Sequence, residues 1–215
     1  MPELAVVPLP NGQFMENCYV VADADQGDAV LIDPGEEAER FLEVIADRGW
    51  RLTAIWLTHA HVDHIMGVAA VRARYRVPTW LHPLDRPLYD ALPQQGAWMG
   101  LQLPAPPAPT DDLAAGVPMR VGGLEFDVRH VPGHSPGSVA FIGHGVAFVG
   151  DVLFSGSVGR TDLPGGDGSA LLASIRRELL SLPDSTVVYS GHGPATTIGA
   201  ERAINPFLTG VYSLE

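Results

Sequence analysis

Short apolar stretches divide the first part of the chain into strands separated by turns. Residues 5–9, 18–22 and 29–33 are runs of this kind, bounded by glycine, proline and polar residues. Residues 52–57 form a longer apolar run of the length expected for a buried strand, and residues 79–81 form a further short strand. This pattern predicts a sheet built from the first part of the chain.

Helical spacing occurs twice among these strands. The first helix is predicted to end at Gly49, and residues 65–76 have the spacing of a second. Residues 93–116 are rich in proline, alanine and glycine, which predicts a long irregular segment of the kind that often serves as a functional loop. Its larger apolar side chains are expected to cover the core, with lining a substrate pocket as the alternative; they are Trp98, Met99 and Leu101. The apolar positions that mark the first helix are Ala38, Phe41, Leu42, Ile45 and Ala46.

The second part of the chain repeats this succession of strands and helices. Residues 124–130 alternate between apolar and polar positions, and residues 138–142 and 146–149 predict a hairpin. Residues 186–190 predict a final strand. It follows a helix whose apolar positions are Leu171, Leu172, Ile175 and Leu179. Together the two parts predict a single α/β domain over residues 1–215, with helices outside two central sheets.

Composition narrows the class of protein. Hydrophobic residues make up 46% of the chain, enough for one sizeable core. The net charge is −12 and all 13 basic residues are arginine, which excludes lysine Schiff-base chemistry and argues against nucleic-acid binding. Cys18 is the only cysteine, so an internal disulfide is excluded and a buried, inert thiol is expected. Without a signal pattern or a membrane-length apolar run, we expect a cytoplasmic protein that binds no membrane.

The strongest chemical signal is a cluster of histidine and aspartate residues between a predicted strand and a predicted helix. His59, His61, Asp63 and His64 lie within six residues, in a chain that has eight histidines. Imidazole and carboxylate ligands together suit zinc, iron or manganese, and no cysteine lies nearby for a thiolate-type structural zinc site. A loop between a strand and a helix is a rigid place to hold such ligands.

Three further candidate ligands follow later in the chain. His134 and His192 lie in turns flanked by glycine, and Asp151 ends a predicted strand directly after Gly150. Glycine beside a ligand permits sharp backbone paths and close approach to a metal. Seven candidate ligands exceed the four of a closed structural zinc site, which favours a catalytic site. Packing or surface roles are expected for the remaining histidines, which are His82, His130 and His144.

These motifs, in this order, resemble the metallo-β-lactamase fold over nearly the whole chain. The resemblance implies a four-layer αββα sandwich and two divalent metal ions, most simply zinc, with iron or manganese as alternatives. It also implies a nucleophilic hydroxide that bridges the metals, with Asp63 accepting a hydrogen bond from it and Asp151 bridging the two ions. The ligands implied for the first metal are His59, His61 and His134, and those for the second are Asp63, His64 and His192.

Residues 150–167 have a more specific resemblance, to the short bacterial form of glyoxalase II (hydroxyacylglutathione hydrolase). The resemblance implies hydrolysis of a small-molecule thioester such as S-lactoylglutathione. Arg160 stands where that branch places a basic residue facing the thiol-bearing substrate, and a carboxylate contact and a structural salt bridge are equal interpretations of it. Only residues 193–215 follow His192, so we expect the helical domain of full-length glyoxalase II to be absent and selectivity for glutathione to be weak.

Two alternatives stay open at this point. A persulfide dioxygenase would use one iron held by His59, His134 and Asp151, although the sequence around Tyr19 and Val62 is closer to the hydrolase branch. A non-catalytic metal-binding module on the same fold is the other alternative, and the retention of every ligand type argues against it. The oligomeric state is not predicted by the sequence.

Overall fold

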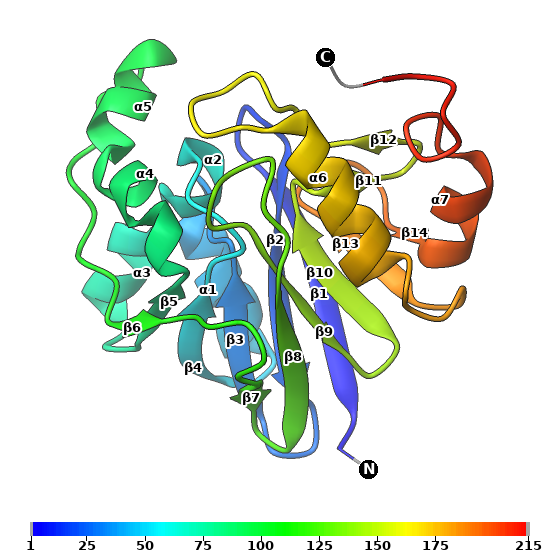
Figure 1. Ribbon diagram of the computed structural model, residues 1–215. Coiled ribbons are helices and arrows are strands. Elements are labelled where there is room, and N and C mark those ends of the chain that lie inside the picture. The colour runs from blue at the N-terminus through cyan, green and yellow to red at the C-terminus, as the bar shows by residue number, and fades with distance from the viewer. Residues whose placement is uncertain (1, 214–215) are drawn as a thin grey trace.

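Two six-stranded sheets pack face to face in the computed structural model, which describes residues 2–213 (Figure 1). The first sheet consists, in spatial order, of β1 (Leu4–Asn11), β2 (Glu16–Asp23), β3 (Asp28–Ile32), β4 (Arg51–Trp56), β5 (Thr79–Leu81) and β6 (Asp111–Asp112). The second consists of β14 (Thr196–Thr197), β13 (Val187–Ser190), β10 (Val146–Gly150), β9 (Val139–Gly143), β8 (Leu124–His130) and β7 (Met119–Val121). A separate short hairpin joins β11 (Leu153–Phe154) to β12 (Ser157–Val158).

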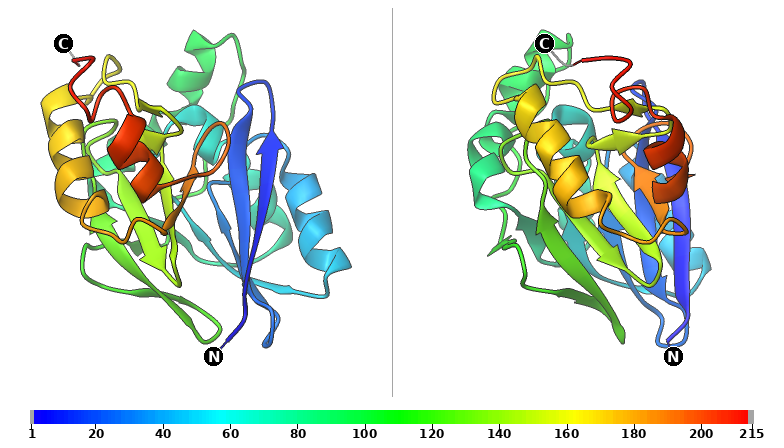
Figure 2. Two further views of the ribbon diagram at one scale, coloured as in Figure 1. Left: turned by 90° about the vertical axis from the view of Figure 1, so that its right-hand side faces the viewer. Right: turned by 45° about the vertical axis from the view of Figure 1, so that its right-hand side comes forward.

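Helices cover the outer face of each sheet, as the turned views in Figure 2 show. The helices of the first part of the chain are α1 (Ala38–Asp47), α2 (Val62–Ile65), α3 (Val68–Arg74), α4 (Arg86–Asp90) and α5 (Leu92–Trp98). Those of the second part are α6 (Gly168–Ser174), which continues into a wider turn at Ile175–Leu179, and α7 (Ile198–Ile204). The predicted four-layer αββα sandwich is therefore confirmed.

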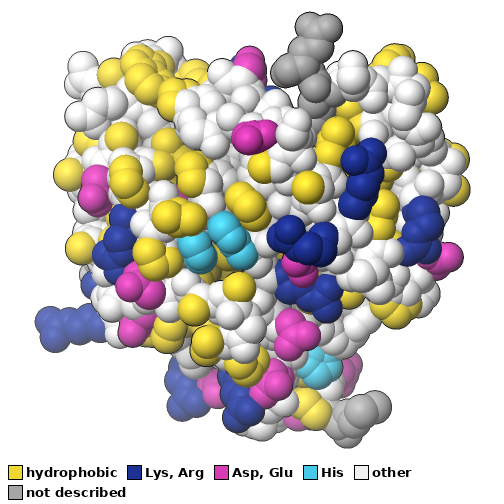
Figure 3. All heavy atoms as spheres, viewed as in Figure 1, with side chains coloured by type: hydrophobic (Ala, Val, Ile, Leu, Met, Phe, Trp, Pro, Cys, Tyr) yellow, Lys and Arg dark blue, Asp and Glu magenta, His cyan; other side chains and the backbone are white. Residues whose placement is uncertain are grey.

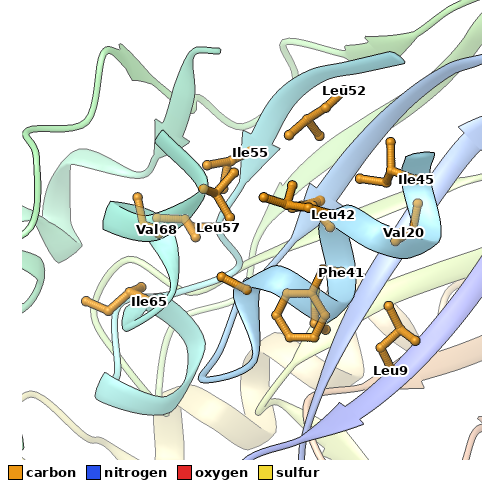
Figure 4. Close-up of a cluster of buried hydrophobic side chains, with 14 of the residues drawn as sticks. Leu9, Val20, Phe41, Leu42, Ile45, Leu52, Ile55, Leu57, Ile65 and Val68 are labelled. Carbon is orange, nitrogen blue, oxygen red and sulfur yellow. The ribbon is translucent and has the colours of Figure 1, made fainter. Parts of the chain in front are cut away.

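Three clusters of buried apolar side chains fill the spaces between the four layers. The cluster between the first sheet and its helices joins Phe41 and Ile45 of α1 to Val20 of β2 (Figure 4). The cluster between the sheets includes Tyr19, and in it Trp56 packs against Phe141 with ring centroids 5.2 Å apart. Successive residues of β2 thus face opposite layers, which explains why the strand is apolar throughout.

Local chemistry fixes several element boundaries. The turn between β9 and β10 places His144 and Gly145 at positive φ (52° and 78°), the geometry of a tight hairpin. The carboxylate of Asp167 accepts a hydrogen bond from the Ala170 amide (2.9 Å) and so caps the start of α6. Cys18 is fully buried, as predicted, and burial raises the pKa of its thiol.

Two predictions in the first part of the chain are wrong in detail. The helix expected at residues 65–76 begins only at Val68 and ends at Arg74, and Ile65 is the last residue of the separate α2, because Gly67 between them packs against the turn after β3. Its amide donates to the Pro34 carbonyl (3.0 Å), and a Cβ atom there would overlap the Gly35 carbonyl oxygen. The segment expected to be irregular at 93–116 begins with α5, which buries Leu92 and Gln95. Proline in the first turn of α5 is compatible with a helix.

Candidate metal centre

All seven candidate ligands lie at one edge of the sandwich, where strands of both sheets end. Two histidines follow β4, an aspartate and a histidine lie in α2, and one ligand each follows β8, β10 and β13. The seven residues, in that order, are His59, His61, Asp63, His64, His134, Asp151 and His192. The structure therefore brings together residues that are far apart in the sequence.

The first group of ligand atoms consists of three ring nitrogens. Nδ1 of His61 lies 2.7 Å from Nε2 of His134, and that Nε2 lies 3.2 Å from Nε2 of His59. All three side chains are buried. Their nitrogens lie close enough to one another to hold a single metal ion.

The second group lies beside the first, with Asp151 between them. Oδ2 of Asp63 lies 3.2 Å from Nε2 of His192 and 3.8 Å from Nε2 of His64. One Asp151 oxygen lies 3.4 Å from Nε2 of His64, and the other lies 3.6 Å from Nε2 of His134 and 3.5 Å from Nε2 of His192. Asp151 is thus within reach of both groups.

Two of the histidines that come from the first half of the chain are oriented by side chains. Nδ1 of His64 lies 3.0 Å from Oδ2 of Asp33 and donates to it. The Thr58 hydroxyl donates its proton to the same Asp33 oxygen (2.5 Å), so it accepts from Nδ1 of His59 at 3.0 Å. Each ring therefore carries a proton on its outer nitrogen, and its Nε2 faces the centre as the atom available to a metal.

Two histidines of the second half are oriented by main-chain carbonyl groups. Nδ1 of His134 donates to the Arg160 carbonyl (2.8 Å), and Nδ1 of His192 donates to the Phe14 carbonyl (3.1 Å). A carbonyl oxygen can only accept, so each of these rings holds a proton on Nδ1, which leaves Nε2 facing the centre as the atom available to a metal. Four inward Nε2 atoms are what a metal-binding histidine cluster requires.

Two observations test whether a cation fits here. Nε2 of His64 and Oδ1 of Asp151 are buried and have no hydrogen-bond partner, which is costly unless another group satisfies them. Gly191 provides the space for their approach, because a Cβ atom at this position would overlap Asp151 Oδ1. The residues present therefore fit a metal ion.

Protonation favours the same conclusion. Burial, with the neighbouring His134, lowers the pKa of His61 to about 3, and burial also lowers the pKa of His59. Both rings are therefore neutral at pH 7, as ligands must be. Burial opposes charge on His192, but its hydrogen bonds with Asp151 and Asp63 raise its pKa to about 10. The two carboxylates thus attract a positive charge at this position.

Two buried carboxylates behind the ligands were not found by sequence reasoning. Asp33 follows β3 with a positive φ of 51° and contacts both His64 and Thr58. Asp85 accepts from the amides of Ala60 (3.0 Å) and Gly137 (2.6 Å) and from the Ser135 hydroxyl (2.8 Å), so it joins the two histidine loops. The only feature of the sequence that could have pointed to Asp33 is the turn that follows it. No such feature marks Asp85, because its contacts come from separate loops.

The other candidate residues lie around the centre. Arg160 lines the pocket over it and is held by Asp162 through two hydrogen bonds of 2.7 and 2.8 Å. Trp98 and Met99 line the same pocket and are exposed, so the core-covering role expected for them is wrong. Away from the centre, the rings of His82 and His130 stack 4.5 Å apart, and His144 lies in the β9–β10 turn.

Comparison with known proteins agrees with this geometry. The family model described as the metallo-beta-lactamase superfamily matches residues 11–192. The chain belongs to the metallo-beta-lactamase superfamily. Members of this superfamily bind divalent metals and are usually hydrolytic enzymes. The metallo-beta-lactamase fold of this chain places the seven candidate ligands at its open edge. No helix within residues 2–213 is both long and apolar enough to cross a membrane.

Similar proteins have several descriptions. The hydroxyacylglutathione hydrolase GloC of Haemophilus influenzae is 40% identical over 206 residues, covering 93% of this chain and 96% of that protein. The structure described as BLEG-1 B3 metallo-beta-lactamase has a TM-score of 0.90 and 42% identity, covering 96% of this chain and all of that one. TTHA1623 in a di-iron-bound form has a TM-score of 0.85 and 47% identity, covering 94% and 100%. ETHE1 from Myxococcus xanthus has a TM-score of 0.81 and 31% identity, covering 96% and 85%.

Proposed function

We propose that the protein is a binuclear metal-dependent hydrolase of small-molecule thioesters. The observation that supports this most directly is the set of four histidines whose outer nitrogens are held and whose inner nitrogens converge on two carboxylates. Zinc is the simplest metal for these ligands, and iron is an alternative because TTHA1623 is described in a di-iron-bound form. The similarity to GloC supports a thioester as the substrate.

Each side chain has a distinct task in this proposal. One metal would be held by His59, His61 and His134, and the second by Asp63, His64 and His192. Asp151 would contact both, since its carboxylate lies near His134 of the first group and near His64 and His192 of the second. Bound divalent ions would lower the pKa of a water molecule and polarise a carbonyl group.

The protein's own groups do the positioning. Asp63 faces the pocket beside His192, where its carboxylate can accept a hydrogen bond from an attacking water and fix the direction of attack. A thiolate leaves more easily than an alkoxide or an amide, so a thioester requires no dedicated acid at the leaving group. The absence of an unassigned acid among the described pocket residues suits this substrate.

A persulfide dioxygenase with one iron is the second candidate. The 31% identity to ETHE1 favours this candidate, which would use only His59, His134 and Asp151 of the seven residues. Nε2 of His134 does lie near the other two side chains, at 3.2 Å and 3.6 Å. The two candidates differ in metal number and in co-reactant, because only the dioxygenase consumes oxygen.

The decisive experiment measures metal and activity on the same sample. Protein purified without added metal would be analysed for its elements and assayed with S-lactoylglutathione. We expect two metal ions per chain and thiol release, and we expect Asp151→Ala to lose at least one ion together with activity. Asp127→Ala removes an exposed carboxylate of β8 and should change neither. If the protein binds no more than one ion per chain and consumes oxygen in the presence of glutathione persulfide, the hydrolase proposal is rejected in favour of the dioxygenase.

A further inference from the structure

The pocket over the centre has walls of a different character from its floor. Its floor consists of candidate ligands, whereas its walls are mainly apolar and come from four separate segments. Trp98 and Met99 are 69% and 47% exposed, although apolar side chains of this size are usually buried. Apolar side chains gather on the surface over α5 in Figure 3. The other apolar residues that line the pocket are Phe14, Val62, Leu88, Phe154, Val158, Leu163 and Pro164.

We propose that this pocket prefers thioesters of an uncharged thiol with an apolar acyl chain over glutathione thioesters. The inference rests on the proposed thioester hydrolysis and specifies its substrate class. An exposed apolar surface beside a reaction centre gains binding free energy by covering itself with an apolar group of the substrate. The argument also requires that the pocket offers little to the carboxylates of glutathione.

The uncharged polar groups of the pocket are of little use to an anionic substrate. The side-chain oxygen of Gln95 accepts from the Val62 amide (3.0 Å), and its nitrogen donates to the carbonyls of Ala60 (3.0 Å) and Leu88 (2.8 Å). This amide is therefore fully used in holding the histidine loop. Outside the ligands, the only other uncharged polar side chain lining the pocket within residues 2–213 is Ser157, whose hydroxyl does not discriminate by charge.

Arg160 is the only cationic side chain, apart from the histidines, among the described residues that line the pocket. Its guanidinium group already forms two hydrogen bonds with the Asp162 carboxylate, at 2.7 and 2.8 Å. A substrate carboxylate would have to displace Asp162 or approach an ion pair with no net charge. The whole chain also has a net charge of −12, which disfavours the approach of anions at low salt.

The primary test compares two thiols that carry the same acyl group. S-butanoylglutathione is anionic, whereas S-butanoyl-N-acetylcysteamine is neutral. We expect kcat/KM of the metal-loaded enzyme to be higher for the neutral ester, and the difference to shrink as salt rises. Lengthening the acyl group on the neutral thiol should raise kcat/KM by up to about fourfold per methylene group. A kcat/KM for the glutathione ester that equals or exceeds that of the neutral ester would overturn the inference.

Two variants locate the selectivity. Asp162→Asn leaves Arg160 without its charged partner and should raise kcat/KM for the glutathione ester about threefold to fivefold, without affecting the neutral ester. Its control is Glu125→Gln, which removes the same charge from the exposed Arg120–Glu125 ion pair of β7 and β8. Equal effects of Asp162→Asn on both esters would contradict the role given to the ion pair.

Trp98→Ala tests the apolar wall. It should lower kcat/KM for a hexanoyl ester about fivefold and flatten the dependence on acyl length. Val117→Ala trims another exposed apolar side chain, before β7, and serves as control. If kcat/KM of Trp98→Ala depends on acyl length as it does in wild type, the apolar wall does not bind the acyl group. If wild type hydrolyses no thioester at all, the proposed function fails instead, so the two failures are distinguishable.

Discussion

The centre takes histidines from the first and the second half of the chain, and the two halves orient these histidines by different means. In the first half, His59 and His64 are oriented through the carboxylate of Asp33, directly or by way of Thr58. In the second half, the rings of His134 and His192 donate to main-chain carbonyl groups. The first arrangement depends on which side chain is present, and the second depends on the path of the backbone.

This difference determines which substitutions each half tolerates. A carbonyl acceptor survives any side-chain replacement at its own residue, provided the backbone stays in place. A carboxylate acceptor is lost with a single substitution. The first half should therefore be sensitive to changes in charged residues, whereas the second should be sensitive to changes in glycine, where the backbone approaches the ligands closely.

Gly191→Ala should have the largest effect, because it disturbs the backbone path of the second half. The added methyl group would overlap Asp151 Oδ1 and crowd the His64 ring. Since a displacement of about 1 Å can cost about 100-fold in rate, we expect kcat/KM to fall at least that far, with loss of about one metal equivalent. Gly145→Ala adds the same group where no heavy atom lies within 4 Å, at a positive φ. It should lower the melting temperature but keep the metal, and equal metal loss in both variants would refute the steric account.

Asp33→Asn should have the next largest effect, on the first half. An amide has one acceptor oxygen, so it cannot accept both from the Thr58 amide and from the Thr58 hydroxyl and His64, and the orientation of His59 and His64 is weakened. We expect metal affinity and activity to fall about 10–100-fold, as measured by chelator competition and thioester hydrolysis. Asp47→Asn, at the exposed end of α1, is the control. Full metal affinity in Asp33→Asn would show that the two halves do not differ in this way.

Sequence reasoning found the candidate ligands but not these supports, for a physical reason. The seven candidate ligands stand out by residue type and by the glycines beside them. Asp33 and Asp85 are ordinary aspartates in the sequence, and their roles arise only when separate loops meet in space. Asp85 contacts residues 25 and more than 50 positions away. Such contacts have no periodic signal along the chain.

The fold shows the same division between local and distant information. Strands such as β8 and the β9–β10 hairpin were predicted because alternation and a tight turn are local patterns. The short helix α5 was missed because proline indicated an irregular segment from residue 93, and no helix was predicted at α4. In the structure, a proline lies in the first turn of each of these helices, where no hydrogen bond is lost.

Asp85→Asn should have an intermediate effect, because Asp85 supports a histidine loop from each half. An amide has one acceptor oxygen, so the substitution leaves at least one of the three donors to Asp85 without an acceptor. We expect destabilisation by about 1–3 kcal/mol and a fall in kcat of about tenfold. Asp90→Asn, which lies on the exposed side of α4, is the matched control. A lower melting temperature with unchanged kcat and metal content would mean that Asp85 stabilises the fold without positioning the ligands.

Arg160→Ala should have the smallest effect on the metal and gives the sharpest test of the comparison. The substitution removes the exposed Arg160–Asp162 ion pair, which is screened by solvent and contributes little to stability. It leaves the carbonyl that accepts from Nδ1 of His134 in place. We therefore expect metal content to stay the same and metal affinity to change by less than about threefold, measured by chelator competition beside Asp33→Asn. A loss of metal as large as that of Asp33→Asn would mean that the second half also depends on its side chains.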